Sequence, residues 1–335
     1  MNIKSTIKIL MPSFLLNWVR KIRYEKLCNS CYKYDATRFT QYSNSLNKWD
    51  NPEKLIGQII AEYHVIEKGL AMSDMRLGFG QDMLSALITH CNLYASRFDK
   101  NNEQFIYALR VIAEYKHEHE KNNHKLDNTL LQAINYLLLK HEGVVPSEQI
   151  TMTKEDYFKY TQSAFDNFSN SRHSLRHFSG NIEIGMIEKA VILAQNAPSS
   201  CNRQPSRVYI IQDKERIEQI LKIQMGNRGF GHLADKLIIL TVELGGYLSL
   251  NERNDVYVNG GIYAMNLLYA LHYYQIGVCA LNWSTMPELD LELRKICEIR
   301  SSETVTLIIA CGGVPDKFKL VTSHRNNPSG ILIII

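Results

Sequence analysis

The chain has 335 residues, of which 45% are hydrophobic and 21% charged, an ordinary globular composition with room for two domains. A net charge of only +4 gives no support for a nucleic-acid-binding protein. Seven irregularly spaced cysteines, an odd number, favour a reducing compartment such as the cytoplasm over a disulfide framework.

The first 140 residues predict a series of helices. Residues 1–27 mix basic and apolar side chains, so they form either a basic amphipathic helix at a membrane surface or, as we expect, a helix packed against the rest of the protein. Residues 52–70 begin with a proline and repeat apolar residues at helical spacing, with Gly69 as the expected C-cap. The same periodicity predicts helices over 81–98, 102–121 and 127–143.

Two clusters of metal-ligand residues occur in this half, and neither predicts a metal site. Cys28 and Cys31 form a single C-x-x-C pair with no second pair to complete a zinc site. His117, His119 and His124 are interleaved with Glu and Lys, a pattern typical of a solvated helix end. We therefore expect unpaired thiols and surface histidines here.

The pattern changes near residue 150, after a connection that contains Gly143 and Pro146. We therefore expect a helical N-terminal domain, residues 1–150, and a second domain, residues 151–335. In the second, strands are predicted at 206–213, 235–244, 278–283, 303–313 and 330–335, and helices at 182–197, 214–224, 258–277 and 289–299. This alternation predicts an α/β or α+β fold with one layered sheet flanked by helices. The helix at 258–277 is nearly all apolar, so we expect it to be buried.

A basic motif, "SRHSLRHF", precedes the first helix of the second domain. It places Arg172, Ser174 and Arg176 within five residues. Two guanidinium groups and a hydroxyl at this spacing suit a phosphate, because arginine offers a planar fork and serine a short donor. A solvated basic turn would produce the same cluster.

The stretch "APSSCNRQP", residues 197–205, precedes a predicted strand. Pro198, Ser199 and Ser200 have little side-chain bulk, so a planar group could approach their backbone. Asn202 and Gln204 each carry a donor and an acceptor on one amide, which suits a uracil-like edge. A capped helix end entering a strand would explain the proline and the asparagine, but it gives Gln204 no role.

Together these motifs resemble the FMN-dependent nitroreductase family, from about residue 160 to the C-terminus. The resemblance is carried by "R-x-S-x-R-x-F" at 172–178, "A-P-S-S-x-N-x-Q-P" at 197–205, a helix ending "N-L-L-x-A-L-H-x-x-x-x-G" at 266–277, and a late Arg325. It implies bound FMN and a homodimer with a flavin pocket at each interface. The family typically uses NAD(P)H, so the resemblance also implies hydride or electron transfer to a small organic acceptor.

The resemblance further implies roles for individual residues. The flavin phosphate would be held by Arg172, His173, Ser174, Arg176 and Arg325. The partner subunit would cover the ring with Pro198, Ser199, Ser200, Asn202 and Gln204, and Asn259 would lie at the rim on that side. A main-chain N–H near Leu281 or Asn282 would donate to flavin N5. Since the flavin itself performs the hydride transfer, no catalytic side chain and no metal are expected.

The sequence also departs from the family pattern. Ser206 follows the Gln-Pro pair where many relatives have an aromatic residue, and the lid region before the long helix is short. The helical N-terminal domain lies outside the family resemblance. On residues 52–70, His64, Glu67 and Lys68 share one helix face and could bind a substrate group at the flavin entrance; a solvated face with a salt bridge is the alternative.

The chain ends with "GILIII", five consecutive branched aliphatic residues after a glycine. An exposed apolar strand promotes aggregation, so we expect this one to be paired. Family members commonly pass a C-terminal strand to the partner's sheet, and pairing within the same chain is the alternative. Two functions remain open: an FMN-dependent oxidoreductase, or a non-catalytic flavin-fold subunit that binds or scaffolds.

Overall fold

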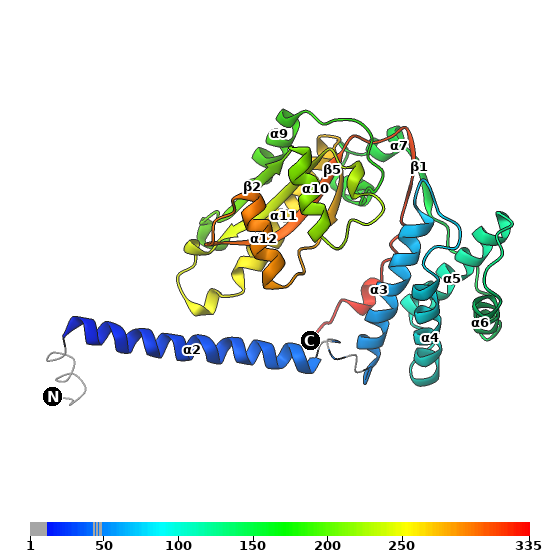
Figure 1. Ribbon diagram of the computed structural model, residues 1–335, viewed down its shortest axis with the longest axis horizontal. Helices are drawn as coiled ribbons and strands as arrows, with labels where there is room; N and C mark the ends of the chain where they lie inside the picture. Colours follow the sequence, from blue (N-terminus) through cyan, green and yellow to red (C-terminus); the bar gives the residue numbers. More distant parts are fainter. Residues whose placement is uncertain (1–11, 43, 45, 47–48) are drawn as a thin grey trace.

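The computed structural model describes residues 12–42, 44, 46 and 49–335. The basic residues before position 12 that entered the amphipathic-helix hypothesis lie outside this part. The N-terminal half is helical, as predicted. Its helices are α2 (Ser13–Tyr42), α3 (Pro52–Leu70), α4 (Gln81–Arg97), α5 (Glu103–Lys121) and α6 (Asn128–Leu139). Helices α3 to α6 lie together on one side of the molecule, and α2 runs beneath the sheet domain that the second half forms (Figure 1).

Helices α3 to α6 surround a core of their own, and we call them the helical domain. Leu55, Leu84 and Ile112 are fully buried in this core. Side-chain caps fix the helix starts: Asn51 accepts from the N–H of Lys54 and begins α3. Gly69 does not cap α3 as predicted; the helix runs to Leu70, and the missing Cβ of Gly69 makes room for the ring of Phe79.

Helix α2 does not pack against the chain in the way that we predicted. It is 30 residues long and buries none of them, and Figure 1 shows it extending away from the rest of the molecule. Its main anchor is an ion pair in which Arg253 Nε lies 2.8 Å from Asp35 Oδ2. No helix in the described ranges is both long and apolar enough to cross a membrane.

The second half forms a sheet domain. Its strands are β1 (Ile150–Thr153), β2 (Ser206–Ile211), β3 (Lys236–Glu243), β4 (Gly277–Leu281), β5 (Glu303–Gly312) and β6 (Lys317–Leu320). Its helices are α7 (Lys154–Phe158), α8 (Phe165–Ser171), α9 (Ile184–Ala194), α10 (Lys214–Ile223), α11 (Asp255–Tyr273) and α12 (Pro287–Cys297). Within the described chain the main sheet has the order β2-β3-β5-β4 with every pair antiparallel, so the expected layered fold is confirmed in its α+β form.

Strand alternation builds two cores, one on each face of the main sheet. On β3, Leu237 and Ile239 face a core that includes residues of α10 and α12. Ile238 faces the other core, with residues of α9 and α11. The main sheet and the helices on its two faces thus form three layers. The short strands β1 and β6, which pair with each other, were not predicted. The domain boundary expected near residue 150 coincides with the start of β1 and remains a prediction.

The structure corrects three further predictions. His119 is fully buried, because its Nε2 accepts the N–H of Gly78 at 2.8 Å, so it is no surface residue. Helix α11 exposes one side, with Val258 and Ile262 55% and 41% exposed. The terminal residues 331–335 form no strand within this chain and are exposed, which excludes pairing with their own sheet.

Candidate functional site

The residues of the basic motif lie on an extended segment between α8 and α9. The N–H of Leu175 donates to the carbonyl of Val278 at 2.7 Å, which ties the segment to β4. Leu175 and His177 are buried, whereas Arg172, Ser174 and Arg176 line a cavity on the other side. The R-x-S-x-R spacing thus brings three alternate residues of an extended segment to the cavity, and His173 between them lines it as well.

We call this cavity, which has a volume of 520 Å³, the anion cavity. It contains all five residues predicted to hold the phosphate, and also His64 of α3. The full lining is His64, Ser169, Asn170, Arg172, His173, Ser174, Arg176, Met265, Tyr269, Val321, Thr322, Ser323 and Arg325. The lining has no carboxylate, and its arginines make no ion pair within the described part of the chain.

Two histidines beside the arginines are kept neutral. Burial, together with the charges of Arg172 and Arg325, lowers the pKa of His173. Burial and the nearby Arg172 lower the pKa of His272, on α11, to about 4. The positive charge of the cavity therefore comes from guanidinium groups that no group in the described chain neutralises, a composition that favours an anionic ligand.

Only one member of the predicted His64, Glu67 and Lys68 triplet lines this cavity. His64 does, and Glu67 is fully buried behind it. Lys68 is half-buried, and burial and the charge of Arg176 lower its pKa. The face is thus partly buried, and it contains the His64–Glu67 ion pair of the alternative interpretation.

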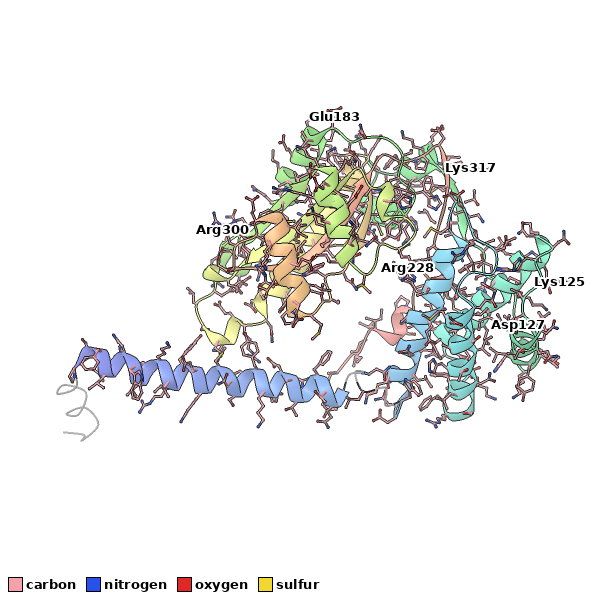
Figure 2. The ribbon with its side chains drawn as sticks, in the orientation of Figure 1. Lys125, Asp127, Glu183, Arg228, Arg300 and Lys317 are labelled. Atoms are coloured by element: carbon pink, nitrogen blue, oxygen red, sulfur yellow. The ribbon has the colours of Figure 1, made fainter. Side chains whose placement is uncertain are left out.

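The helical domain meets the basic segment directly. The ring Nε2 of His177 lies 2.8 Å from the carbonyl oxygen of Ala71, just after α3. Gly229 lies against Met72, so the loop after α10 also reaches this point. Figure 2 places Arg228, from the same loop, on the side of the sheet domain that faces α3. The end of α3 therefore packs against the basic segment, and α3 reaches the anion cavity itself through His64.

The 197–205 loop lies in a second, separate cavity of 210 Å³. Pro198, Ser199 and Gln204 line it, whereas Asn202 is exposed outside it and Ser200 contacts the helix below. Cys201, Asn202 and Gln204 all have positive φ angles, of 51°, 55° and 49°. Such backbone is costly for residues other than glycine and concentrates at functional sites.

Asn259 lies beneath this loop rather than at a rim. Its side chain is buried, and its Oδ1 accepts the N–H of Ser200 at 2.8 Å. Its Nδ2 donates to Ser200 Oγ at 3.0 Å and to the carbonyl of Asp255 at 2.7 Å. Because these bonds use the whole amide, Asn259 holds the loop in shape.

Arg203 fixes the far end of the loop. Its guanidinium pairs with Glu252 at 2.6 Å and also donates to the carbonyls of Ser200 and Gly246. The hydrogen bond from Arg203 lowers the pKa of Glu252 from 4.5 to about 2.

We expect Glu252→Gln to lower the melting temperature at neutral pH, with a deficit that shrinks as the pH falls from 4.5 towards 2. The folded-state pKa lies below the unfolded value, so the pair stabilises the fold above pH 4.5, and this contribution is lost as the carboxyl group protonates. Thermal unfolding of both proteins across this pH range measures the difference. A deficit that does not change with pH would contradict this role.

The two cavities share no residue, although α11 contributes to both. Asn259 and Tyr263 line the loop cavity, and Met265 and Tyr269 line the anion cavity. Ten residues of helix separate Asn259 from Tyr269, or about 15 Å. One chain therefore places the arginines of the basic motif and the 197–205 loop in two separate cavities.

Strand β4 supplies the predicted backbone donor region. It is an edge strand of the main sheet, and Leu281 is buried whereas Asn282 is exposed. Asn282 follows the end of β4, and its carbonyl accepts from Nε2 of Gln224 at 2.9 Å. Leu281 and Asn282 both remain candidates for the donor.

The sequence reasoning missed several cavity residues. Tyr269 and Ser169 were not identified; their hydroxyls are 2.6 Å apart, and Ser169 comes from the short helix α8. Thr322 and Ser323 were also missed, although they stand in the same polar run as Arg325. That run, which follows a strand, was the signal that could have identified them.

Comparisons with known proteins agree with the resemblance found in the sequence. Residues 170–228 match the model of the Nitroreductase family, a segment that contains both the basic motif and the 197–205 loop. The resemblance is thus confirmed for this segment. No curated protein matches the chain.

Solved structures show partial similarity. An FMN-dependent nitroreductase from Clostridium difficile R20291 is 21% identical, covering 48% of this chain and 98% of that chain with a TM-score of 0.40. A nitroreductase family protein from Streptococcus pneumoniae TIGR4 is 20% identical, covering 51% and 100%, with a TM-score of 0.44. A Desulfovibrio desulfuricans protein solved in complex with FMN is 18% identical, covering 52% and 98%, with a TM-score of 0.45.

Proposed function

We propose that this protein is an FMN-dependent oxidoreductase of the nitroreductase type. In this proposal NAD(P)H reduces the flavin, which passes a hydride or electrons to a small organic acceptor. The observation that carries the proposal is the anion cavity, where Arg172, Arg176 and Arg325 converge without a carboxylate partner in the described chain. The family match over residues 170–228 supports the same assignment.

The donor set fits one phosphate monoester. Three guanidinium groups and the hydroxyl of Ser174 match the charge and the oxygens of a single terminal phosphate. The sequence has no G-x-G-x-x-G loop for a dinucleotide pyrophosphate, which favours FMN over FAD. Bound there, the flavin would supply hydride chemistry at its N5 atom.

The chain's own residues would bind, orient and tune this group. Burial raises the pKa of the Cys279 thiol on β4, and the charges of Arg176 and Lys68 oppose this rise, so both charges lie near the strand edge as well as the cavity. Positive charge near the flavin N1 and O2 atoms would stabilise the reduced, anionic state. The backbone N–H groups of Leu281 and Asn282 are our candidates for orienting N5.

We propose that the active form is a homodimer. The arginines of the anion cavity and the 197–205 loop lie in different cavities of one chain. In this proposal the loop of a partner chain completes the flavin site around each anion cavity. Helix α11 supports this assembly, because it exposes an apolar stripe that includes Val258, Ile262 and Met265. The exposed residues 331–335 support it as well.

Lys68 is our candidate for contact with the acceptor. It comes from the helical domain, lies beside Arg176 and has no carboxylate partner within the described residues. We expect Lys68→Ala to reduce turnover of an acidic acceptor by about tenfold while leaving FMN affinity within twofold of wild type. Steady-state kinetics with an acidic and a neutral acceptor, and FMN titration, make the comparison. An equal loss with both acceptors would contradict the role.

Anaerobic addition of NADH or NADPH tests the proposed function. In the oxidoreductase the flavin absorbance near 450 nm is bleached and then restored by an acceptor. A protein that binds FMN but is reduced by neither nucleotide would instead match the non-catalytic alternative.

The cytoplasmic location expected from the cysteine count belongs to this proposal, and cell fractionation tests it.

A further inference from the structure

The helical domain reaches the anion cavity through the side chain of His64. This residue comes from α3, yet it lines the same cavity as Arg172 and Arg325. Its side chain is 38% exposed, so it is accessible to a ligand there. The family resemblance gives no role to this position, because the helical domain lies outside it.

A buried carboxylate orients the His64 ring. Nδ1 of His64 lies 3.3 Å from Oε2 of Glu67, whose side chain has no exposed surface. The other oxygen of Glu67 accepts the hydroxyl of Tyr107 at 2.6 Å. Burial and Glu67 raise the pKa of Tyr107, so its hydroxyl remains a donor. With Nδ1 engaged, Nε2 is the ring nitrogen without a partner in the described part of the chain.

The same domain holds the segment that carries Arg325. This segment, residues 321–327 and here called the C-terminal strap, follows β6 and runs along the helical domain. The ring of His324 stacks on Tyr107 with centroids 4.9 Å apart. Next along the strap, Asn326 accepts from the side chain of Gln104, and the N–H of Asn327 donates to Glu103 Oε2 at 2.8 Å.

The strap contacts both the cavity and the helical domain. Val321, Thr322, Ser323 and Arg325 line the anion cavity, whereas His324 and Asn326 contact the helical domain. A left-handed turn at Ser323, with φ of 50°, bends the chain between them. The position of Arg325 in the cavity thus depends on contacts made by its neighbours with α5.

We propose that His64 is a ligand of the FMN phosphate, oriented by Glu67, so that the phosphate joins the helical domain to the sheet domain. This inference rests on the proposed function. Glu67 engages Nδ1 of His64, so Nε2 is the ring nitrogen that would contact the phosphate. In this proposal the helical domain retains the cofactor, in place of the substrate role that the sequence suggested for His64 and Glu67.

Titration with FMN and with riboflavin tests this proposal, because riboflavin lacks the phosphate. His64→Ala is expected to weaken FMN binding by about tenfold and to leave riboflavin binding within twofold of wild type. Glu67→Gln is expected to weaken FMN binding by a smaller factor, because the ring stays but loses its anionic partner. His117→Ala, an exposed histidine of α5, is the matched control and is expected to change neither.

A second measurement guards against a folding defect. The ³¹P resonance of bound FMN should shift in His64→Ala and stay unchanged in His117→Ala. Equal losses of FMN and riboflavin affinity, or an unchanged FMN affinity with an unshifted resonance, would overturn the proposal for His64. If the wild-type protein binds neither flavin, the proposed function itself fails.

Discussion

Replacing Arg325 with alanine is expected to weaken FMN binding by about 10- to 150-fold, and Arg172→Ala and Arg176→Ala are expected to have similar effects. Each change removes a charge-assisted hydrogen bond to phosphate, worth about 1.5–3 kcal/mol. Lysine should restore binding only in part, because it lacks the planar fork. Fluorescence titration with FMN measures the three variants.

Arg300→Ala is the matched control, because this arginine is exposed on the sheet domain away from the anion cavity (Figure 2). It should bind FMN as the wild type does. Wild-type affinity in all three cavity variants would show that the cavity does not hold the phosphate. If the cavity variants lose no more FMN affinity than Arg300→Ala does, the phosphate role of the cavity is contradicted as well.

If the protein is the homodimer proposed above, deleting Ile331 to Ile335 is expected to dissociate it and to release FMN. These residues are 69–116% exposed in the single chain, so a partner is needed to bury them. Burial of each aliphatic side chain contributes about 1.5–3 kcal/mol, enough for the tail to decide the assembly. The cofactor is lost with the partner because each flavin site would take its 197–205 loop from the other chain.

Light scattering and absorbance of the truncated protein measure both effects. Replacing the same five residues with serine separates loss of apolar burial from loss of chain length, and it should behave like the deletion. A truncated protein that remains dimeric and keeps its flavin would rule out this role for the tail. A monomer that keeps its flavin would show that one chain completes the site alone.

The convergence of the basic motif on one cavity could be predicted from the sequence because its signal is local. Arg172, Ser174 and Arg176 alternate along five residues, and extended backbone places alternating side chains on one side. Arg325 is a lone arginine in a polar run after a strand, so its assignment to the same site depended mainly on the family resemblance. Its position depends on contacts between the strap and α5, which are far apart in the sequence.

Other features depend on which surfaces pack against each other, and the periodicity of the sequence does not specify this. The one-faced triplet on α3 was recognised, but only the packing of the two domains shows that Glu67 is buried and that His64 reaches the cavity. The apolar pattern of α11 predicted burial, which the single chain provides on one side only. The strands β1 and β6 are four residues each, too short for a periodic signal.

The absorption spectrum of the purified protein, with chromatography of the released cofactor, tests the central proposal most directly. We expect a yellow protein with one non-covalent FMN per chain, and no FAD. Colourless protein should take up added FMN and gain the flavin spectrum. A colourless protein that takes up no FMN would contradict the assignment of the anion cavity as a flavin phosphate site.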